Sequence, residues 1–402
     1  MTAPSHETAL LSERPTAELA GLRTRALALV VIGGAGMAAG FLTRARVDFL
    51  QSYLIAFVFW MGITLGSMAL LMVQYLSGGA WGLFSRRVFE ASSRNIGLMF
   101  LLFLPIWLNL PVLYSWARPE AAHDANIQAK AAYLNPAFFG VRVVLFFGIW
   151  GVLIFLLNRW SKEQDGEAPR LPGPKDGRLR VLSGPGLVLY MLTLTFMSVD
   201  WVMSLDPHFF STIFGILMLG GQGLSTLAFT ILILQRLSRA KPLSEVAAAD
   251  HFHDLGKLML AFVMLWAYFN VSQLIIIWSG NLPEEIPWYI ARLQGPWEPW
   301  AVLVLVGHFA LPFLLLLSRP RKREPTRLAR VALFILLMRT VDIIWTIGPV
   351  FRHTSTFDWL DYAAIAGVGG VWLFFFTRNI GARALVPAHD PYFKGAMAHG
   401  GH

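Results

Sequence analysis

Cysteine is absent from all 402 residues of this chain. Without a thiol, the chain forms no disulfide, supplies no thiolate to an iron–sulfur cluster and attaches no c-type haem through a CxxCH motif. Phosphate-binding loops are lacking as well, because the glycine-rich stretches Gly33 to Gly40 and Gly220 to Gly223 lie inside apolar runs. Small residues in such runs allow close helix packing instead.

Charge is scarce too. Asp, Glu, Lys and Arg make up 14% of the residues and hydrophobic residues 56%, whereas a soluble domain carries about 25% charged residues. A helix needs about 20 apolar residues to cross a membrane, and ten runs approach or exceed that length: 26–41, 49–73, 95–114, 136–157, 185–203, 211–234, 258–277, 300–317, 331–350 and 362–377. The composition predicts an all-α integral membrane protein with about ten transmembrane helices.

The first run has an alternative interpretation as part of a signal peptide spanning residues 1–41, because Arg23 and Arg25 precede a Gly/Ala-rich apolar stretch. We favour a transmembrane span. The polar segment ahead of it is long for a signal peptide, and Thr43 to Asp48 resembles a short loop into the next span.

The formal net charge of +9 is compatible with nucleic-acid binding, but the positions of the basic residues point elsewhere. Of the 33 Lys and Arg residues, 25 fall in the two terminal segments and in the loops after spans 2, 4, 6 and 8, and only 6 in the alternate loops. This asymmetry predicts that both termini are cytoplasmic. The basic runs "RPRKREPTR" and "RLSRAK" then set orientation and contact lipid headgroups, and we expect no nucleic-acid partner.

The chain contains a weak internal repeat. The best match places "VDWVMSLDPHF" of span 5 over "VDIIWTIGPVF" of span 9, with Asp200 opposite Asp342. Weaker matches join span 2 with span 6 and span 4 with span 8. Because four spans separate each pair, the copies share one orientation. We predict two parallel four-helix bundles, 49–203 and 209–350, flanked by spans 1 and 10 within a membrane domain of 26–377, with polar tails 1–25 and 378–402.

Ionisable residues inside spans are costly and usually functional. Our candidates for a proton pathway are Asp200, Asp342, Arg339, His308 and Arg142, and the uncharged polar residues inside spans are Asn109, Asn270 and Gln273. Asp200 lies in the outer half of span 5 with no partner on its own helix, which makes it the leading candidate for proton exchange. Arg339 precedes Asp342 by three residues, within ion-pair reach, so a purely structural pair is the alternative there. For His308 the alternative is a hydrogen-bonded packing role.

Histidine positions exclude a membrane cytochrome b, which needs two axial histidines at similar depth. Of ten histidines only His308 lies in a span. The cluster "DHFHD", from Asp250 to Asp254, has the residue types of a metal site. We favour a solvated loop, and predict no metal.

The outer loop 278–299, "WSGNLPEEIPWYIARLQGPWEP", is rich in aromatic residues. Two interpretations stay open: an interfacial aromatic belt, or a docking surface for an extracytoplasmic partner. The candidate docking residues are Trp278, Glu284, Glu285, Trp288, Tyr289, Arg292 and Trp297.

Two motifs carry a family resemblance. "DWVMSLDPHFFSTIFG" and "YFNVSQLIIIWSGNLPEEIPWYIARLQGPW" resemble the second quinone-binding-type membrane subunit, ActF, of alternative complex III, a relative of the NrfD/polysulfide-reductase membrane anchors. The likeness runs from about span 2 to span 9. Phe209 departs from the family, in which Trp is more frequent at this position, and the change is conservative.

The resemblance implies a subunit of a quinol:electron-acceptor oxidoreductase in the bacterial inner membrane. Its partners would be multihaem and monohaem cytochrome c subunits, an iron–sulfur subunit and an NrfD-like paralogue, which pass electrons from quinol to a cytochrome c or a terminal oxidase. The haem c and iron–sulfur clusters would belong to those partners and none to this chain. Quinol is a candidate ligand, although the better-supported site belongs to the larger paralogue. The family's proposed proton path would fall on Asp200 and, through the repeat, on Asp342.

Two rival functions remain. A secondary transporter fits the repeat and the buried charges but lacks helices clearly broken at corresponding positions of both halves. A quinone-binding membrane anchor of another respiratory oxidoreductase is the second rival.

Overall fold

The computed structural model describes residues 16–166, 177–353, 357–387 and 390, and within them it is all-helical. Residues 1–15 and 391–402, which hold much of the two predicted tails, lie outside the described residues. Nine membrane-length helical segments are present in the described part: α2 (Thr16–Thr43), α3 (Arg46–Ser77), α8 (Pro136–Gly166), α9 (Gly177–Trp201), α10 (Phe214–Leu237), α12 (Ala249–Gly280), α14–η6–α15, α17 (Pro325–Ile347) and α18 (Trp359–Gly381). A multi-pass membrane protein follows from these lengths and their apolar composition.

The predicted span 95–114 differs from the expectation of one helix. It forms α5 (Ile96–Trp107) and the single turn α6 (Leu110–Leu113). Pro105 lies inside α5 and Pro111 at the start of α6, and each lacks the backbone N–H that a continuous helix would use. The 12 residues of α5 reach only about 18 Å, so this segment does not match the length of its neighbours.

The seventh long segment is interrupted in a different way. Helix α14 (Glu298–Leu303) continues into the π-helix η6 (Val304–Ala310) and then into α15 (Leu311–Leu317). A π-helical turn inserts an extra residue into a helix and is frequent at functional sites. Here it contains His308, the one histidine that the sequence places inside a span.

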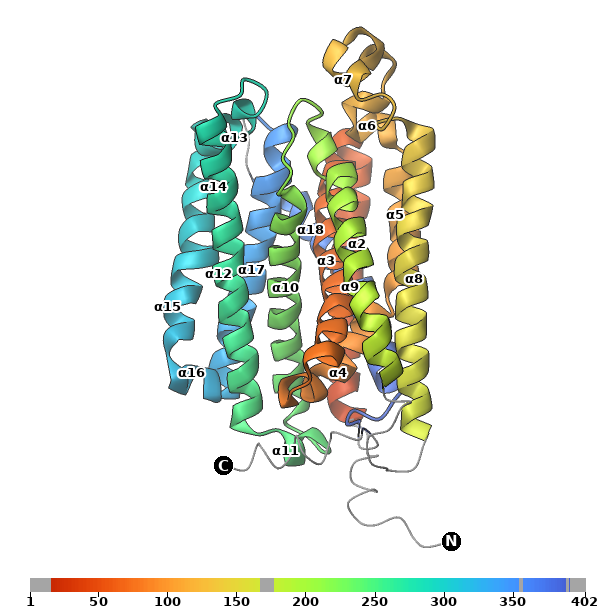
Figure 1. Cartoon of the computed structure of the whole chain (residues 1–402), viewed down its shortest axis with the longest axis vertical. Coiled ribbons are helices and arrows are strands. Elements are labelled where there is room, and N and C mark those ends of the chain that lie inside the picture. The colour runs from red at the N-terminus through yellow and green to blue at the C-terminus, as the bar shows by residue number, and fades with distance from the viewer. Residues whose placement is uncertain (1–15, 167–176, 354–356, 388–389, 391–402) are drawn as a thin grey trace, which may run out of the picture.

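Short helices cover the two ends of the bundle (Figure 1). Helices α4 (Ala80–Ser93), α11 (Leu243–Val246) and α16 (Arg319–Arg323) lie at the lower end, and α7 (Ala125–Ala129) and α13 (Ile286–Leu293) at the upper end. The turns η1 (Ser115–Ala117), η2 (Pro119–His123), η4 (Met203–Leu205), η5 (Gly295–Trp297) and η7 (Gly348–Val350) complete the described elements.

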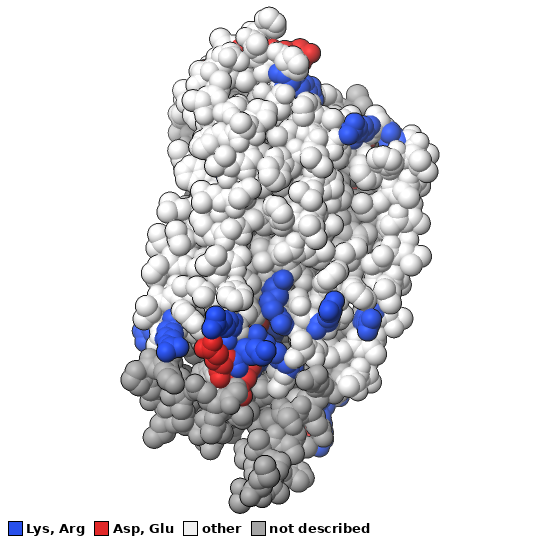
Figure 2. All heavy atoms as spheres, turned by 90° about the vertical axis from the view of Figure 1, so that its right-hand side faces the viewer, with Lys and Arg blue, Asp and Glu red and all other residues white. Residues whose placement is uncertain are grey.

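Charged side chains are scarce across the middle of the surface drawn in Figure 2. On the face drawn in Figure 2, Lys and Arg gather towards the lower end, a few lie near the upper end, and a broad uncharged band separates them. Many large exposed side chains of the helices are apolar, for example Val31, Val152 and Leu314. This band fits the hydrocarbon core of a bilayer. That the lower, basic end faces the cytoplasm stays a prediction.

Two central helices join the two predicted units. Helix α3 contacts α5 and α9 on one side and α10 on the other, and α10 contacts α12 and α17. Both α3 and α10 run from the upper to the lower end, because α4 follows the first and α11 the second (Figure 1). We call α3–α9 the first half and α10–α17 the second half. The internal repeat itself stays a prediction.

The first and last helices pack against each other. A Cβ atom on Gly33 of α2 would lie 2.1 Å from the backbone nitrogen of Gly367 in α18, so the two backbones touch at this point. Small residues that bring helices together are typical of membrane interfaces. Helix α18 in turn packs on α3, which fixes the α2–α18 pair to the first half.

Candidate functional site

Asp200 and Arg142 form a buried ion pair, here called the first-half pair. Asp200 is 0% exposed. Arg142 of α8 donates through Nε to Oδ2 of Asp200 at 2.8 Å and through Nη2 to Oδ1 at 3.0 Å. Its remaining nitrogen, Nη1, donates to the carbonyl oxygen of Tyr133 at 2.9 Å. A bidentate geometry of this kind is the strongest form of a carboxylate–guanidinium pair.

This pair changes the interpretation of Asp200. From the sequence alone it has no partner on its own helix, and the structure supplies one from the neighbouring helix. The ring of Tyr133 also lies 3.8 Å from the guanidinium carbon of Arg142, which adds a cation–π contact. Both carboxylate oxygens and all three guanidinium nitrogens are thus occupied. Such an arrangement holds α8 to α9, and protonation of Asp200 would weaken both bonds from Arg142.

Asp342 lies in a second polar group, here called the second-half cluster: Trp266, His308, Arg339 and Asp342. Arg339 and Asp342 pair within α17, three residues apart, as predicted. The indole nitrogen of Trp266 in α12 donates to the same carboxylate oxygen, Oδ2, at 3.2 Å. Arg339 and Trp266 therefore both donate to one oxygen of Asp342. In the first-half pair, by contrast, the two bonds from Arg142 go to the two different oxygens of Asp200.

His308 completes the cluster and is unsatisfied. Its ring packs on the ring of Trp266 with centroids 4.4 Å apart. The residue is 0% exposed, and neither Nδ1 nor Nε2 has a hydrogen-bond partner among the described residues. A buried polar atom without a partner costs about 1–3 kcal/mol. The hydrogen-bonded packing role that we considered for His308 therefore has no support in the geometry.

Two glycines of α10 make room for the cluster. A Cβ atom on Gly221 would lie 2.2 Å from the guanidinium carbon of Arg339, and one on Gly220 would lie 3.3 Å from Cα of Trp266. The glycine stretch predicted to allow close packing thus accommodates a buried arginine. Any side chain at position 221 must displace that guanidinium.

The three uncharged candidates lie outside the cluster. Asn109 caps the break between α5 and α6, where it donates to the carbonyl of Pro105 at 2.7 Å and accepts from Arg46. Asn270 donates to the carbonyl of Trp266, one turn earlier, at 2.8 Å. Gln273 accepts from Ser211 at 3.0 Å. Asn270 thus binds within its own helix, whereas Asn109 and Gln273 also bind residues 63 and 62 positions away in the sequence.

The outer loop divides into exposed and buried residues. Trp278, which is 79% exposed, and Glu284 face outwards, and Tyr289 is half-buried. The remaining docking candidates, Glu285, Trp288, Arg292 and Trp297, are buried. Their side chains therefore cannot line a docking surface or an interfacial belt, which corrects the expectation for these four residues.

The buried part of this loop packs against the upper end of α17. Trp288 stacks on Phe209 with centroids 4.9 Å apart. Arg292 donates to the carbonyl oxygens of Trp288 at 2.8 Å and Thr346 at 2.6 Å. Burial lowers the pKa of Arg292 to about 9, because the side chain has carbonyl partners but no carboxylate at ion-pair distance among the described residues.

The "DHFHD" segment is helical and not a loop. It forms the start of α12, where His251 is buried and its Nδ1 accepts from the backbone nitrogen of Ala248 at 3.2 Å. Asp250 pairs with Arg323, and Asp254 pairs with Lys257 at 3.0 Å. No group of metal-ligating side chains gathers within the described ranges.

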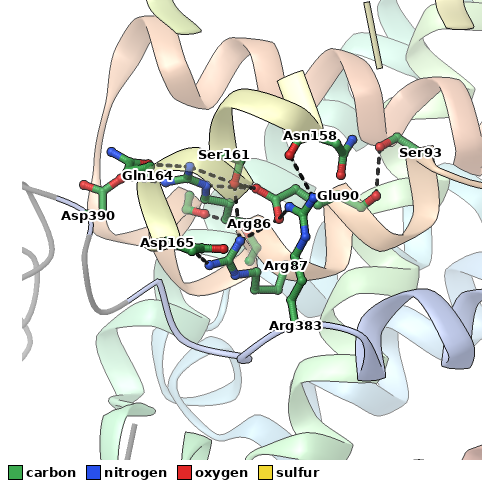
Figure 3. A network of polar contacts seen from close by, with 12 residues as sticks. Arg86, Arg87, Glu90, Ser93, Asn158, Ser161, Gln164, Asp165, Arg383 and Asp390 are labelled. Atoms are coloured by element: carbon green, nitrogen blue, oxygen red, sulfur yellow. Dashed lines mark hydrogen bonds and ion pairs between the residues drawn. The ribbon is translucent and has the colours of Figure 1, made fainter. Parts of the chain in front are cut away.

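A network at the lower end of the first half was not foreseen (Figure 3). Glu90 of α4 accepts from Arg86 at 3.1 Å and Arg87 at 2.8 Å, and from Ser161 of α8 at 2.5 Å. Arg383, beyond α18, lies 3.3 Å from the same carboxylate. We call Arg86, Arg87, Glu90, Ser161 and Arg383 the basal network. Burial opposes ionisation of Glu90, but the three guanidinium groups together hold its pKa well below the usual range.

Sequence reasoning missed Trp266 and the whole basal network. The spacing of Arg86, Arg87 and Glu90, three and four residues apart on one helix, is a signal for ion pairing. Nothing in the sequence connects Ser161 or Arg383 to them, since these come from segments 71 and 293 residues away. Trp266 gave no signal, because an aromatic residue in an apolar span is ordinary packing material.

Comparisons with known proteins add no identification. No protein-family model matches the chain, and no curated protein matches it.

Proposed function

We propose that this chain is an integral membrane subunit of a respiratory quinol oxidoreductase of the alternative complex III type, which joins redox subunits and provides a proton-exchange site in its second half. The observation that carries the proton role is His308, fully buried, without a hydrogen-bond partner in the described part of the chain, and in contact with the ring of Trp266. The membership of the complex rests on the resemblance of the two motifs given above.

The proton role follows from the chemistry of the second-half cluster. Histidine is the side chain whose unperturbed titration lies closest to neutral pH. Trp266 touches both His308 and Asp342, and Asp342 is a carboxylate whose positive partner, Arg339, is already in place. Protonation of His308 would place a new charge beside an existing ion pair. In this proposal the cluster takes up and releases a proton while the surrounding helices stay fixed.

The first-half pair has a structural role in this proposal. Removing one partner of a buried pair leaves an uncompensated charge, so Asp200 and Arg142 hold α8 to α9. The scaffold role falls to the rigid first half and to the exposed apolar helix faces, which other membrane subunits would cover.

The positions of the helix interruptions favour the proposed subunit over a secondary transporter. The breaks lie between α5 and α6, in predicted span 3, and in η6, in predicted span 8. In the predicted repeat, span 3 corresponds to span 7 and span 4 to span 8. Transporters of the repeat type break corresponding helices in both halves, and here the two interruptions do not correspond.

The assembly part of the proposal is tested by isolating the native complex in mild detergent. Co-isolation with multihaem cytochrome c and iron–sulfur subunits, together with quinol-driven reduction of a cytochrome c, is the expected result. A chain that purifies alone as an oligomer and takes up solute into vesicles would refute it. Proton release by the intact complex in vesicles, counted for each quinol oxidised, tests the proton role.

A further inference from the structure

A cavity lies between the start of α2 and the end of α18. It has a volume of about 570 Å³, and its lining includes Arg23 of α2 and Arg378 of α18 together with the apolar side chains of Leu19 and Phe374. Thr377 adds a hydroxyl to the lining. The cavity thus combines two cations with an apolar wall, and neither the proposed proton site nor the basal network uses it.

The two arginines lack carboxylate partners. Within the described ranges, neither Arg23 nor Arg378 lies within ion-pair distance of an acidic side chain, although both are exposed. Glu18, the acidic residue of α2, is already paired with Arg236 at 2.5 Å. The guanidinium of Arg23 lies over the ring of Phe374 at 5.1 Å. A face-on contact of this kind leaves the N–H groups at the guanidinium edge available to an anion.

An apolar strip continues from the cavity along α2. Arg23, Leu27 and Val31 follow one another at intervals of four residues and therefore lie on one face of the helix. Leu27 is 46% exposed and Val31 is 69% exposed. The site therefore offers cations at the level where charged side chains begin and exposed apolar side chains where the hydrocarbon core would be.

We propose that this cavity binds the headgroup of an anionic phospholipid, with its phosphate between Arg23 and Arg378 and its acyl chains along Leu27 and Val31. Basic pockets between transmembrane helices suit anionic headgroups, and guanidinium groups bind phosphate through paired hydrogen bonds. A free phosphate ion would use the two cations but not the strip. An acidic protein segment would use the cations without a need for exposed apolar side chains on the membrane side.

The test is native mass spectrometry of the full chain in detergent, titrated with phosphatidylglycerol and, separately, with phosphatidylcholine of the same acyl chains. The expected result for the unmodified chain is preferential retention of phosphatidylglycerol. The double variant Arg23→Ala, Arg378→Ala should retain it roughly 10- to 30-fold more weakly. Arg25→Ala is the matched control, because Arg25 is exposed on the same helix but does not line the cavity.

Three results would overturn the proposal. The first is equal retention of the two lipids by the unmodified chain, a comparison that needs no variant. The second is equal loss in the double variant and in Arg25→Ala. The third is full displacement of phosphatidylglycerol by millimolar inorganic phosphate or by an acidic peptide, which would assign the site to a free anion or to a protein segment.

Discussion

The two halves of the molecule treat their buried ionisable residues in opposite ways. In the first half, every buried charged residue of the described chain lies in an ion pair: Arg86, Arg87, Glu90, Arg142 and Asp200. In the second half only Arg339 and Asp342 pair with each other. The other buried charged residues and histidines there have no oppositely charged partner within the described ranges: His251, Glu285, Arg292, His308 and Lys322.

This difference separates two uses of charge in a membrane protein. A fully paired buried group fixes the helices that carry it, because loss of either partner is costly. A buried polar group without a partner lowers stability. Because neither ring nitrogen of His308 has a hydrogen-bond partner among the described residues, His308 can take up a proton without breaking an existing contact. Asp200 and Asp342 occupy matching positions of the predicted repeat, but we infer different roles for them.

The largest effect on stability is expected from breaking the first-half pair. Arg142→Ala leaves the Asp200 carboxylate buried without its bidentate partner, and such a loss costs about 3–5 kcal/mol. We expect the melting temperature of the chain in detergent to fall strongly. Fluorescence-detected size exclusion after heating measures this change. Arg159→Ala is the control, since Arg159 lies on the same helix and pairs with Glu163 at the surface. Equal melting temperatures of Arg142→Ala and Arg159→Ala would contradict the structural role of the first-half pair.

The basal network should also stabilise the fold, and its contribution to stability should depend on pH. Glu90→Gln removes the negative charge that three arginines share, at a cost of about 3 kcal/mol near neutral pH. Because the pKa of Glu90 is lowered on folding, its contribution is complete above the unfolded value of about 4.3 and is lost as the pH falls towards the folded value. The melting difference between the unmodified chain and the variant should therefore be full at pH 7 and shrink below about pH 4. A difference that does not change with pH would contradict the charge assignment.

A smaller effect is expected from crowding the second-half cluster without changing its charge. Gly221→Ala places a methyl group against the Arg339 guanidinium, and overpacking of this kind costs about 1–3 kcal/mol. We expect a modest loss of melting temperature and a disturbed proton release in the intact complex. Gly148→Ala is the control, since a Cβ atom there meets open space. A Gly221→Ala variant that behaves like the control would mean that Arg339 moves freely, against the packing described here.

The sequence predicted the parts of the fold that depend on local composition. Apolar runs predicted all nine membrane-length segments of the described residues, because a backbone in lipid must satisfy its own hydrogen bonds within each helix. The expectation failed for 95–114, where Pro105 and Pro111 interrupt the helix despite continuous apolar character. The proline positions were visible in the sequence, but their effect on an apolar helix depends on what the neighbouring helices allow.

The site was predictable only where partners lie on one helix. Arg339 and Asp342 are three residues apart, so their pairing followed from helical geometry. Arg142 and Asp200 are 58 residues apart, and their contact depends on how α8 rotates against α9. The same limit applies to the outer loop, because nothing in its sequence shows that Trp288 and Arg292 turn inwards whereas Trp278 stays exposed.

Proton release by His308→Leu tests the central claim most directly. Leucine removes the two unpaired ring nitrogens and keeps an apolar side chain against Trp266, so the melting temperature should not fall. Phe309→Leu, one residue along the same π-helix, is the matched control. In the intact complex in sealed vesicles, we predict that His308→Leu still reduces the acceptor but releases fewer protons for each quinol oxidised, whereas Phe309→Leu keeps the full number. An unchanged proton count in His308→Leu would contradict the account.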